Sequence, residues 1–332
     1  MTSRREFLIA SGAGLCLLAA PFASFAQQES KVRRIGFLAL RSRSTAPNPD
    51  PYYDAFVKGM RELGYVEGKN LVTEWRFADG KYGRLPALAA ELVQMKVEVI
   101  VTQGPGTQAL QRVTSTIPIV FVAVNDPVGS GVVANLARPG GNVTGLSLMA
   151  VDLGPKHLEL LKTMMPGLSS VAVLVNFGNA GHPAILKSVQ AAAQQVGIEV
   201  LPVNARAPEE IERGFATMTR ERAEAVIIVA DGFFFAQRQH IAGLVLKNRM
   251  PSMFSSREEV EAGGLMSYGQ NLIDHYRRAA TYVDKILKGA RPGELPIEQP
   301  TKVHLAINLR TAKALGITVS KELRFRADEV IE

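Results

Sequence analysis

The amino-acid sequence predicts an α/β protein of two domains, each a doubly wound parallel sheet with helices on both faces. Apolar stretches of strand length alternate with segments whose apolar residues recur at helical spacing. The strand-length stretches are apolar throughout, which is typical of parallel strands covered on both faces. The alternation starts again after "ARPGGNVTGLS" (137–147), which divides the chain into two blocks.

The first block contains four predicted strands and two clear helices. The strands lie at 34–40, 70–77, 97–103 and 117–124, and the helices at 51–64 and 84–96. One stripe of the first helix is expected to be buried, and it consists of Tyr53, Phe56, Val57, Met60 and Leu63.

The second block repeats this order without a clear sequence repeat. Its strands are predicted at 170–176, 198–204, 224–231, 250–255 and 263–269, and its helices at 154–167, 183–197, from Pro208 onward and at 235–249. A late helix at 273–289 is expected to bury Ile273, Tyr276, Ala280, Val283 and Leu287. The tail, 301–317, is expected to add a strand and a helix.

The first 26 residues have the features of an export signal. Arg4-Arg5 precede a short apolar stretch, and Ser24-Phe25-Ala26 offers a cleavage site before polar residues. The arginine pair followed by Phe7-Leu8 indicates the twin-arginine type. Cleavage near Ala26 removes Cys16, the single cysteine, so disulfides are not expected to stabilise the fold.

The composition and the absence of several motifs argue against some classes of function. Hydrophobic residues make up 47% of the 332 residues and charged residues 21%, as in ordinary globular proteins. No dense stripe of Lys and Arg with interleaved aromatics accompanies the net charge of +7, so nucleic-acid binding is not predicted. The five histidines are scattered, which argues against a metal site, and no nucleophile elbow or P-loop is present.

The stretch "VTQGPGTQAL" (101–110) has the spacing of a dinucleotide-binding loop. Gly104, Gly106 and Ala109 follow a predicted strand, and Asp126 stands about twenty residues on. An exported nicotinamide-dependent oxidoreductase is therefore the alternative function. Pro105 argues against it, because it removes one of the N–H groups that would hold the pyrophosphate, and no catalytic set accompanies the loop. The loop instead favours a solute's carboxylate, bound by backbone N–H groups and the Thr107 hydroxyl.

Ligands of open parallel sheets bind beyond the carboxyl ends of the strands, so two such sheets predict one interdomain cleft. Its candidate ligand-binding residues are Ser42, Gly104, Gly106, Thr107, Asn125, Asp126, Asn176, Asp231, Phe233, Phe254 and Tyr268. Several have competing roles. Thr107 can cap its helix alone or also bind the ligand, a turn role is favoured for Asp126, and ligand contact is favoured for Asp231. At least one ring of Phe233–Phe235 is expected in the core, and Tyr268 belongs either to the pocket or to a hinge.

Four stretches carry a resemblance to a known family: 61–71, 115–147, 260–292 and 298–317, together with the terminal "ADEVIE". They resemble the exported substrate-binding proteins of ABC transporters, of the tryptophan/tyrosine type. The resemblance implies the type I periplasmic binding fold, whose two domains are joined by three crossings and close on the ligand. The crossings are expected near 146–150, 266–270 and 295–300, where Gly, Ser and Pro gather.

The resemblance also implies an organisation and a role. The N-terminal domain would comprise 31–147 and 270–297, and the C-terminal domain 148–269 and 298–332. The protein would be a monomeric, non-enzymatic receptor without a cofactor, located in the periplasm and serving an ABC permease. An aromatic amino acid is the first expectation for its ligand, with other amino acids and aromatic acids as alternatives. Arg41 or Arg43 would favour an extra acidic group if it pointed inward, but we expect both to be solvated loop residues.

Overall fold

The computed structural model of the protein describes residues 32–43, 45 and 50–332; the predicted export signal lies outside them. A first sheet has five parallel strands in the order β2-β1-β3-β4-β5. They are β1 (Arg33–Ala39), β2 (Leu71–Phe77), β3 (Val99–Thr102), β4 (Ile119–Val124) and β5 (Val143–Ser147). This order is that of a doubly wound sheet: β2 is added on one side of β1, and β3, β4 and β5 are added on the other. The point at which the strand order reverses therefore lies between β1 and β3.

A second sheet of seven strands has the order β12-β11-β10-β9-β8-β6-β7. Its strands are β6 (Ser170–Val175), β7 (Glu199–Asn204), β8 (Ala225–Ile228), β9 (Ser252–Phe254), β10 (Met266–Gly269), β11 (His304–Asn308) and β12 (Glu329–Ile331). Five of these strands, in the spatial order β7-β6-β8-β9-β10, repeat the winding of the first sheet, and the strand order reverses between β6 and β8. The expectation of a wholly parallel sheet is wrong at one pair, because β11 runs antiparallel to β10.

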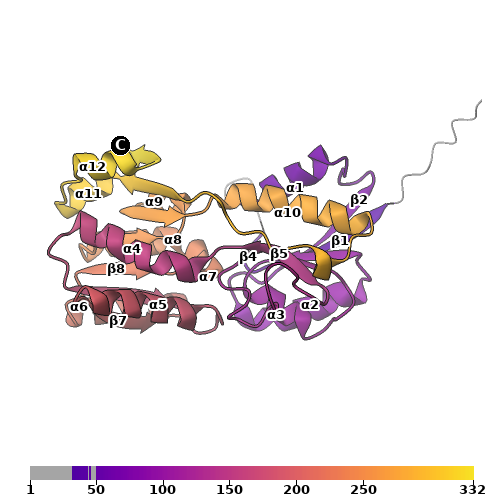
Figure 1. Cartoon of the computed structure of the whole chain (residues 1–332), viewed down its shortest axis with the longest axis horizontal. Helices are drawn as coiled ribbons and strands as arrows, with labels where there is room; N and C mark the ends of the chain where they lie inside the picture. Colours follow the sequence, from indigo (N-terminus) through magenta and orange to yellow (C-terminus); the bar gives the residue numbers. More distant parts are fainter. Residues whose placement is uncertain (1–31, 44, 46–49) are drawn as a thin grey trace, which may run out of the picture. The chain divides into compact units, whose positions relative to one another are not determined.

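Helices cover both faces of the first sheet (Figure 1). Helices α1 (Pro51–Glu62) and α10 (Leu272–Leu287) pack on one face, and α2 (Leu85–Gln94) and α3 (Pro105–Gln111) on the other. Successive residues of β1 point to opposite faces of the sheet, so Phe37 packs with α1 and α10, whereas Leu38 packs with α2 and α3. Helix α10, although late in the sequence, thus completes the first domain.

The second sheet is covered in the same way. Helices α4 (Ala150–Met164), α5 (His182–Gln195), α11 (Leu309–Leu315) and α12 (Lys321–Arg326) pack on one face. Helices α6 (Pro208–Arg220) and α8 (Arg238–Lys247) pack on the other, together with the short α7 (Gly232–Ala236). The remaining short helices are α9 (Arg257–Glu261) and the 3₁₀ turns η1 (Tyr82–Arg84) and η2 (Pro292–Glu294).

Two predicted core positions lie at the surface instead. Leu63 is the C-cap residue of α1, and Ile273 is the second residue of α10; their exposed fractions are 37% and 40%. Both lie at helix ends, beyond the part of each helix that packs on its neighbour. The other predicted residues of the late helix are buried: Tyr276, Ala280, Val283 and Leu287.

Strand β5 was not among the predicted strands. Its sequence, "VTGLS", contains Gly145, which weakens a strand pattern. Gly145 has a φ of 151°, and a Cβ there would lie 2.0 Å from the carbonyl oxygen of Phe121 in β4. Glycine therefore permits the close approach of the two strands that completes the sheet.

Three chain segments cross between the sheets. They follow β5, follow β10, and precede β11. The third runs beside the first, because Ser147 N–H donates to the Glu298 carbonyl and Glu298 N–H donates to the Gly145 carbonyl, both at 2.9 Å. The side chain of Gln270, on the second crossing, donates to the Leu148 carbonyl on the first. Within the part of the chain described, no helix is long and apolar enough to cross a membrane.

Candidate ligand site

The loops at the reversal points of both sheets surround one cavity. It has about 600 Å³ of empty space, including solvent at its mouth. The first domain contributes residues at or just after the ends of β1, β3 and β4, the first residue of α3 and two residues of α10: Leu40, Arg41, Gln103, Gly104, Pro105, Ala123, Asn125, Leu272 and Tyr276. The second contributes Leu148, Asn179, Ala230, Asp231, Gly232, Phe235, Ser255, Ser256 and Glu259. Doubly wound sheets place ligands at such points, because neighbouring loops diverge there and leave a crevice.

Arg41 lies on the wall of this cavity and is 7% exposed. Its Nε and Nη2 donate to the two Asp50 carboxylate oxygens at 2.8 and 3.2 Å. Its guanidinium carbon lies within 6 Å of four aromatic rings: Tyr52 at 4.9 Å, Tyr53 at 5.0 Å, Phe235 at 5.2 Å and Tyr276 at 5.7 Å. The expectation of a solvated side chain is therefore wrong for Arg41, whereas Arg43 is exposed. The Asp50 carboxylate and the ring faces together compensate the buried charge.

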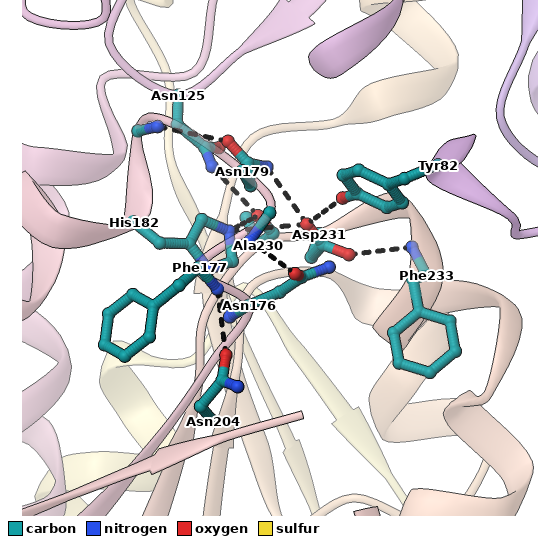
Figure 2. A network of polar contacts seen from close by, with 12 residues as sticks. Tyr82, Asn125, Asn176, Phe177, Asn179, His182, Asn204, Ala230, Asp231 and Phe233 are labelled. Carbon is teal, nitrogen blue, oxygen red and sulfur yellow. Dashed lines mark hydrogen bonds and ion pairs between the residues drawn. The ribbon is translucent and has the colours of Figure 1, made fainter. Parts of the chain in front are cut away.

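Asp231 lies in the loop after β8 and caps α7 (Figure 2). Its Oδ1 accepts from the Phe233 N–H at 2.9 Å. Its Oδ2 accepts from the Tyr82 hydroxyl at 2.6 Å and from Asn179 Nδ2 at 3.0 Å. The carboxylate is fully buried and accepts hydrogen bonds from η1, from the loop after β6 and from α7.

His182 lies beside this carboxylate, and its tautomer follows from its partners. Its Nδ1 accepts from the Asn176 N–H at 2.8 Å, so the proton is on Nε2. Nε2 lies 3.2 Å from the Ala230 carbonyl and 3.4 Å from Asp231 Oδ2. Burial lowers the pKa of His182, and the opposing effect of Asp231 is smaller. His182 is therefore a neutral donor that fixes the loop after β8.

Glu259, on α9, is a second buried carboxyl group on the cavity wall. Its Oε2 accepts from Ser256 N–H and Oγ, both at 2.9 Å, and more weakly from Ser255. Burial raises the pKa of Glu259 to about 7, because the loss of hydration outweighs the serine hydrogen bonds. Ser256 and Glu259 form a capping box, and the spacing "SREE" (256–259) carries that signal in the sequence.

The glycine loop differs from the expected anion site. Gly104, with a φ of 48°, is the residue before α3. The N–H groups of Gly104, Gly106 and Thr107 donate to the carbonyls of Ala123, Gln103 and Gly104. These donors are used within the fold, so none of the three N–H groups is left for the carboxylate that the sequence predicts there. Thr107 is not the cap residue either, because its hydroxyl is fully buried and has no hydrogen-bond partner.

The structure brings three of the candidate residues to the cavity wall: Gly104, Asn125 and Asp231. The others lie elsewhere. Ser42 is exposed, Gly106 and Thr107 are buried in α3, and Asp126 forms a turn through a hydrogen bond from the Gly129 N–H. Asn176 Oδ1 accepts from the Gly178 N–H, behind the wall. Phe233 and Phe254 are in the core, and Tyr268 is a strand residue of β10 paired with β11.

Sequence reasoning missed several wall residues that have no motif of their own. Gln103, Asn179, Leu272 and Tyr276 are examples. All three rings of Phe233–Phe235 are buried, and only Phe235 reaches the cavity.

Comparisons with known proteins bear on this site. Residues 45–331 match the sequence model of a family described as ABC transporter substrate binding protein. A tyrosine-binding protein of Clostridioides difficile (strain R20291) is 26% identical over 273 residues, which covers 82% of this chain and 78% of the relative. A conserved domain protein of Vibrio cholerae, known from its crystal structure, is 28% identical to this chain. The two structures superpose with a TM-score of 0.83, over 90% of this chain and 100% of the other.

Two further solved structures, each 24% identical, share the fold. The ABC domain from Streptococcus pneumonia in complex with L-Trp has a TM-score of 0.82 and covers 90% of this chain and 99% of its own. The ligand-free, open structure of a substrate binding protein with adhesive properties from Clostridium difficile has a TM-score of 0.63 at the same coverage. The predicted two-domain fold of type I periplasmic binding proteins is confirmed. The chain belongs to the family of ABC transporter substrate binding proteins.

Proposed function

We propose that the protein captures a small amphipathic solute in the cavity between its two sheets and delivers it to an ABC permease. The cavity's position at both reversal points carries this proposal. Its wall combines buried charged groups with apolar surface from Leu40, Phe235 and Tyr276, which suits a ligand with one polar end and one apolar end.

The ligand class we propose is an aromatic amino acid. One relative is named for tyrosine binding and another is solved with L-Trp, although neither is closely similar. Two carboxyl groups on the wall, Asp231 and Glu259, suit the ammonium group of such a ligand. Arg41 does not favour an additional acidic group, since Asp50 already pairs with it. We retain Gly104, Asn125 and Asp231 in the proposed site and add Arg41, Gln103 and Glu259.

We further propose that ligand binding closes the two domains about their three crossings. The domains would comprise 31–147 with 270–297, and 148–269 with 298–332. The packing of α10 on α1 and the place of β11 in the second sheet support this division. The higher TM-score against the L-Trp complex than against the ligand-free, open relative supports a closed arrangement.

Residues 1–26 would export the chain to the periplasm, where it would act as a monomer without a cofactor. This part of the proposal depends on the sequence and on the family. The nicotinamide-dependent oxidoreductase has no support among the comparisons, which match solute-binding proteins.

Native mass spectrometry of the protein purified directly from its producing cells tests the proposal. A co-purifying molecule with the mass of an aromatic amino acid is the expected result. Bound NAD(P) or a flavin would contradict it and restore the oxidoreductase. Denaturing mass spectrometry of the same sample reports whether the mature chain begins at Gln27.

A further inference from the structure

Among the described residues, and apart from contacts along the three crossings, two side-chain hydrogen bonds join the two domains. The Tyr82 hydroxyl, from η1 in the first domain, donates to Asp231 Oδ2 in the second at 2.6 Å. Asn125 Nδ2, after β4, donates to the Ala230 carbonyl at 3.0 Å. Figure 2 shows Tyr82 and Asn125 reaching the same loop after β8. Both bonds end on adjacent residues, so this loop is where the domains meet.

Tyr82 is not a wall residue of the cavity, yet it packs on both domains. Its ring contacts the first-domain cluster that contains Leu85 and the second-domain cluster that contains Phe233. A Cβ at Gly178, in the second domain, would lie 3.6 Å from the ring, which is ordinary contact distance. The side chain therefore fills space that exists only when the domains are together.

The other donors to Asp231 come from its own domain. They are the Phe233 N–H and Asn179 Nδ2. His182 Nε2 lies 3.4 Å from the carboxylate in the same domain. All three residues follow strands of the second sheet, so their contacts persist whatever the separation of the domains. Burial and the neighbouring carboxylate raise the pKa of Tyr82 well above its usual value, so the hydroxyl keeps its proton. Tyr82 is thus the one hydrogen-bond donor to this carboxylate, among the described residues, that opening of the domains would remove.

We propose that Tyr82 is a positioning residue that latches the closed form onto Asp231 and thereby slows release of the ligand without touching it. This inference rests on the proposed function, because it names a regulator of affinity at the same site. A hydrogen bond to a charged group typically contributes enough free energy to change an equilibrium constant about tenfold to a hundredfold.

The test compares Tyr82→Phe with Tyr65→Phe, using L-tyrosine and L-tryptophan as probes in stopped-flow binding. Tyr65 is a matched control, because its hydroxyl donates at 3.0 Å to Asp284 within the first domain. Tyr82→Phe is expected to raise the dissociation rate about tenfold or more with little change in the association rate. Tyr65→Phe is expected to leave both rates unchanged. Equal dissociation rates for wild type and Tyr82→Phe would overturn the latch.

If neither amino acid binds the wild type, that result counts against the proposed ligand class and not against the latch. A second measurement then tests the latch without ligand. Spin labels at Val128→Cys and Phe177→Cys, in a Cys16→Ser background, report the separation of the domains. Both positions are exposed and follow strands β4 and β6. Tyr82→Phe is expected to shift the ligand-free distance distribution toward longer distances. Identical distributions with and without the substitution would contradict the latch.

Discussion

The Arg41 guanidinium, just after β1, is paired in two-pronged fashion with the Asp50 carboxylate that begins α1. The side chains of the two residues are only 8% and 11% exposed. This pair joins the residue just after β1 to the start of α1, beside the cavity. A positively charged wall residue is thereby neutralised before any ligand arrives.

Asp50→Asn is expected to destabilise the protein by about 3–5 kcal/mol, because it leaves a buried charge without its partner. The amide can still accept from the N–H groups of α1, so loss of charge is the main change. Urea unfolding measures the effect. Asp79→Asn is the control, since the Arg84–Asp79 pair is about half exposed and is expected to contribute less than about 1 kcal/mol. Equal effects for the two variants would show that burial of the Arg41 pair has no energetic consequence.

Asp231→Ala is expected to lower the stability of the ligand-free protein by at least about 2 kcal/mol. It removes the cap of α7, the acceptor of the hydrogen bonds from Tyr82 and Asn179, and the carboxylate beside His182. Thermal unfolding without ligand measures this loss. Asp126→Ala, at a turn near the surface, is expected to cost less than about 1 kcal/mol. An unchanged melt of Asp231→Ala would mean that these contacts do not support the fold.

Glu259 makes stability depend on pH. Burial raises its pKa from 4.5 to about 7, so the folded protein holds a proton that the unfolded chain releases between these values. Its contribution is therefore fully present below pH 4.5 and is lost as the pH rises through 7. The loss is about 3 kcal/mol for a shift of this size.

Urea titrations of wild type and Glu259→Gln from acid to slightly alkaline pH measure this effect. The stability of the wild type relative to the variant is expected to fall with rising pH, because glutamine has no proton to release. If the difference in unfolding free energy between wild type and variant stays constant over the whole pH range, then folding does not raise the pKa of Glu259.

Thr107→Val is expected to leave ligand affinity unchanged and stability equal or up to about 1 kcal/mol higher. The buried hydroxyl has no partner, so valine removes an unsatisfied polar group at similar volume. Calorimetric titration and thermal unfolding measure the two quantities. A clear loss of affinity would return Thr107 to the ligand site.

The repeated strand–helix order of the sequence was sufficient to predict two doubly wound domains, because periodic burial is a local signal. The antiparallel pairing of β11 with β10 has no such signal, since it depends on where the chain returns after α10. Strand β5 was missed because Gly145 weakens its pattern and only the neighbouring carbonyl explains the glycine.

Prediction of the site was limited by side-chain direction. Asp231 was found because it follows a wholly apolar strand, and Asn125 for a similar reason. Tyr82 contacts the loop after β8, and Glu259 lines the cavity, only because of tertiary packing that the sequence pattern does not show. The glycine loop kept its position on the wall, but the N–H groups predicted to bind an anion are bonded within the protein.

A crystal structure of the protein with L-tyrosine or L-tryptophan tests the central claim most directly. We predict one ligand per chain between the reversal points of the two sheets, in contact with Arg41 or Gln103 on one side and with Asp231 or Glu259 on the other. Ligand bound instead in the separate groove that contains Arg257 and His304, or a cavity left without ligand at saturating concentration, would contradict the account.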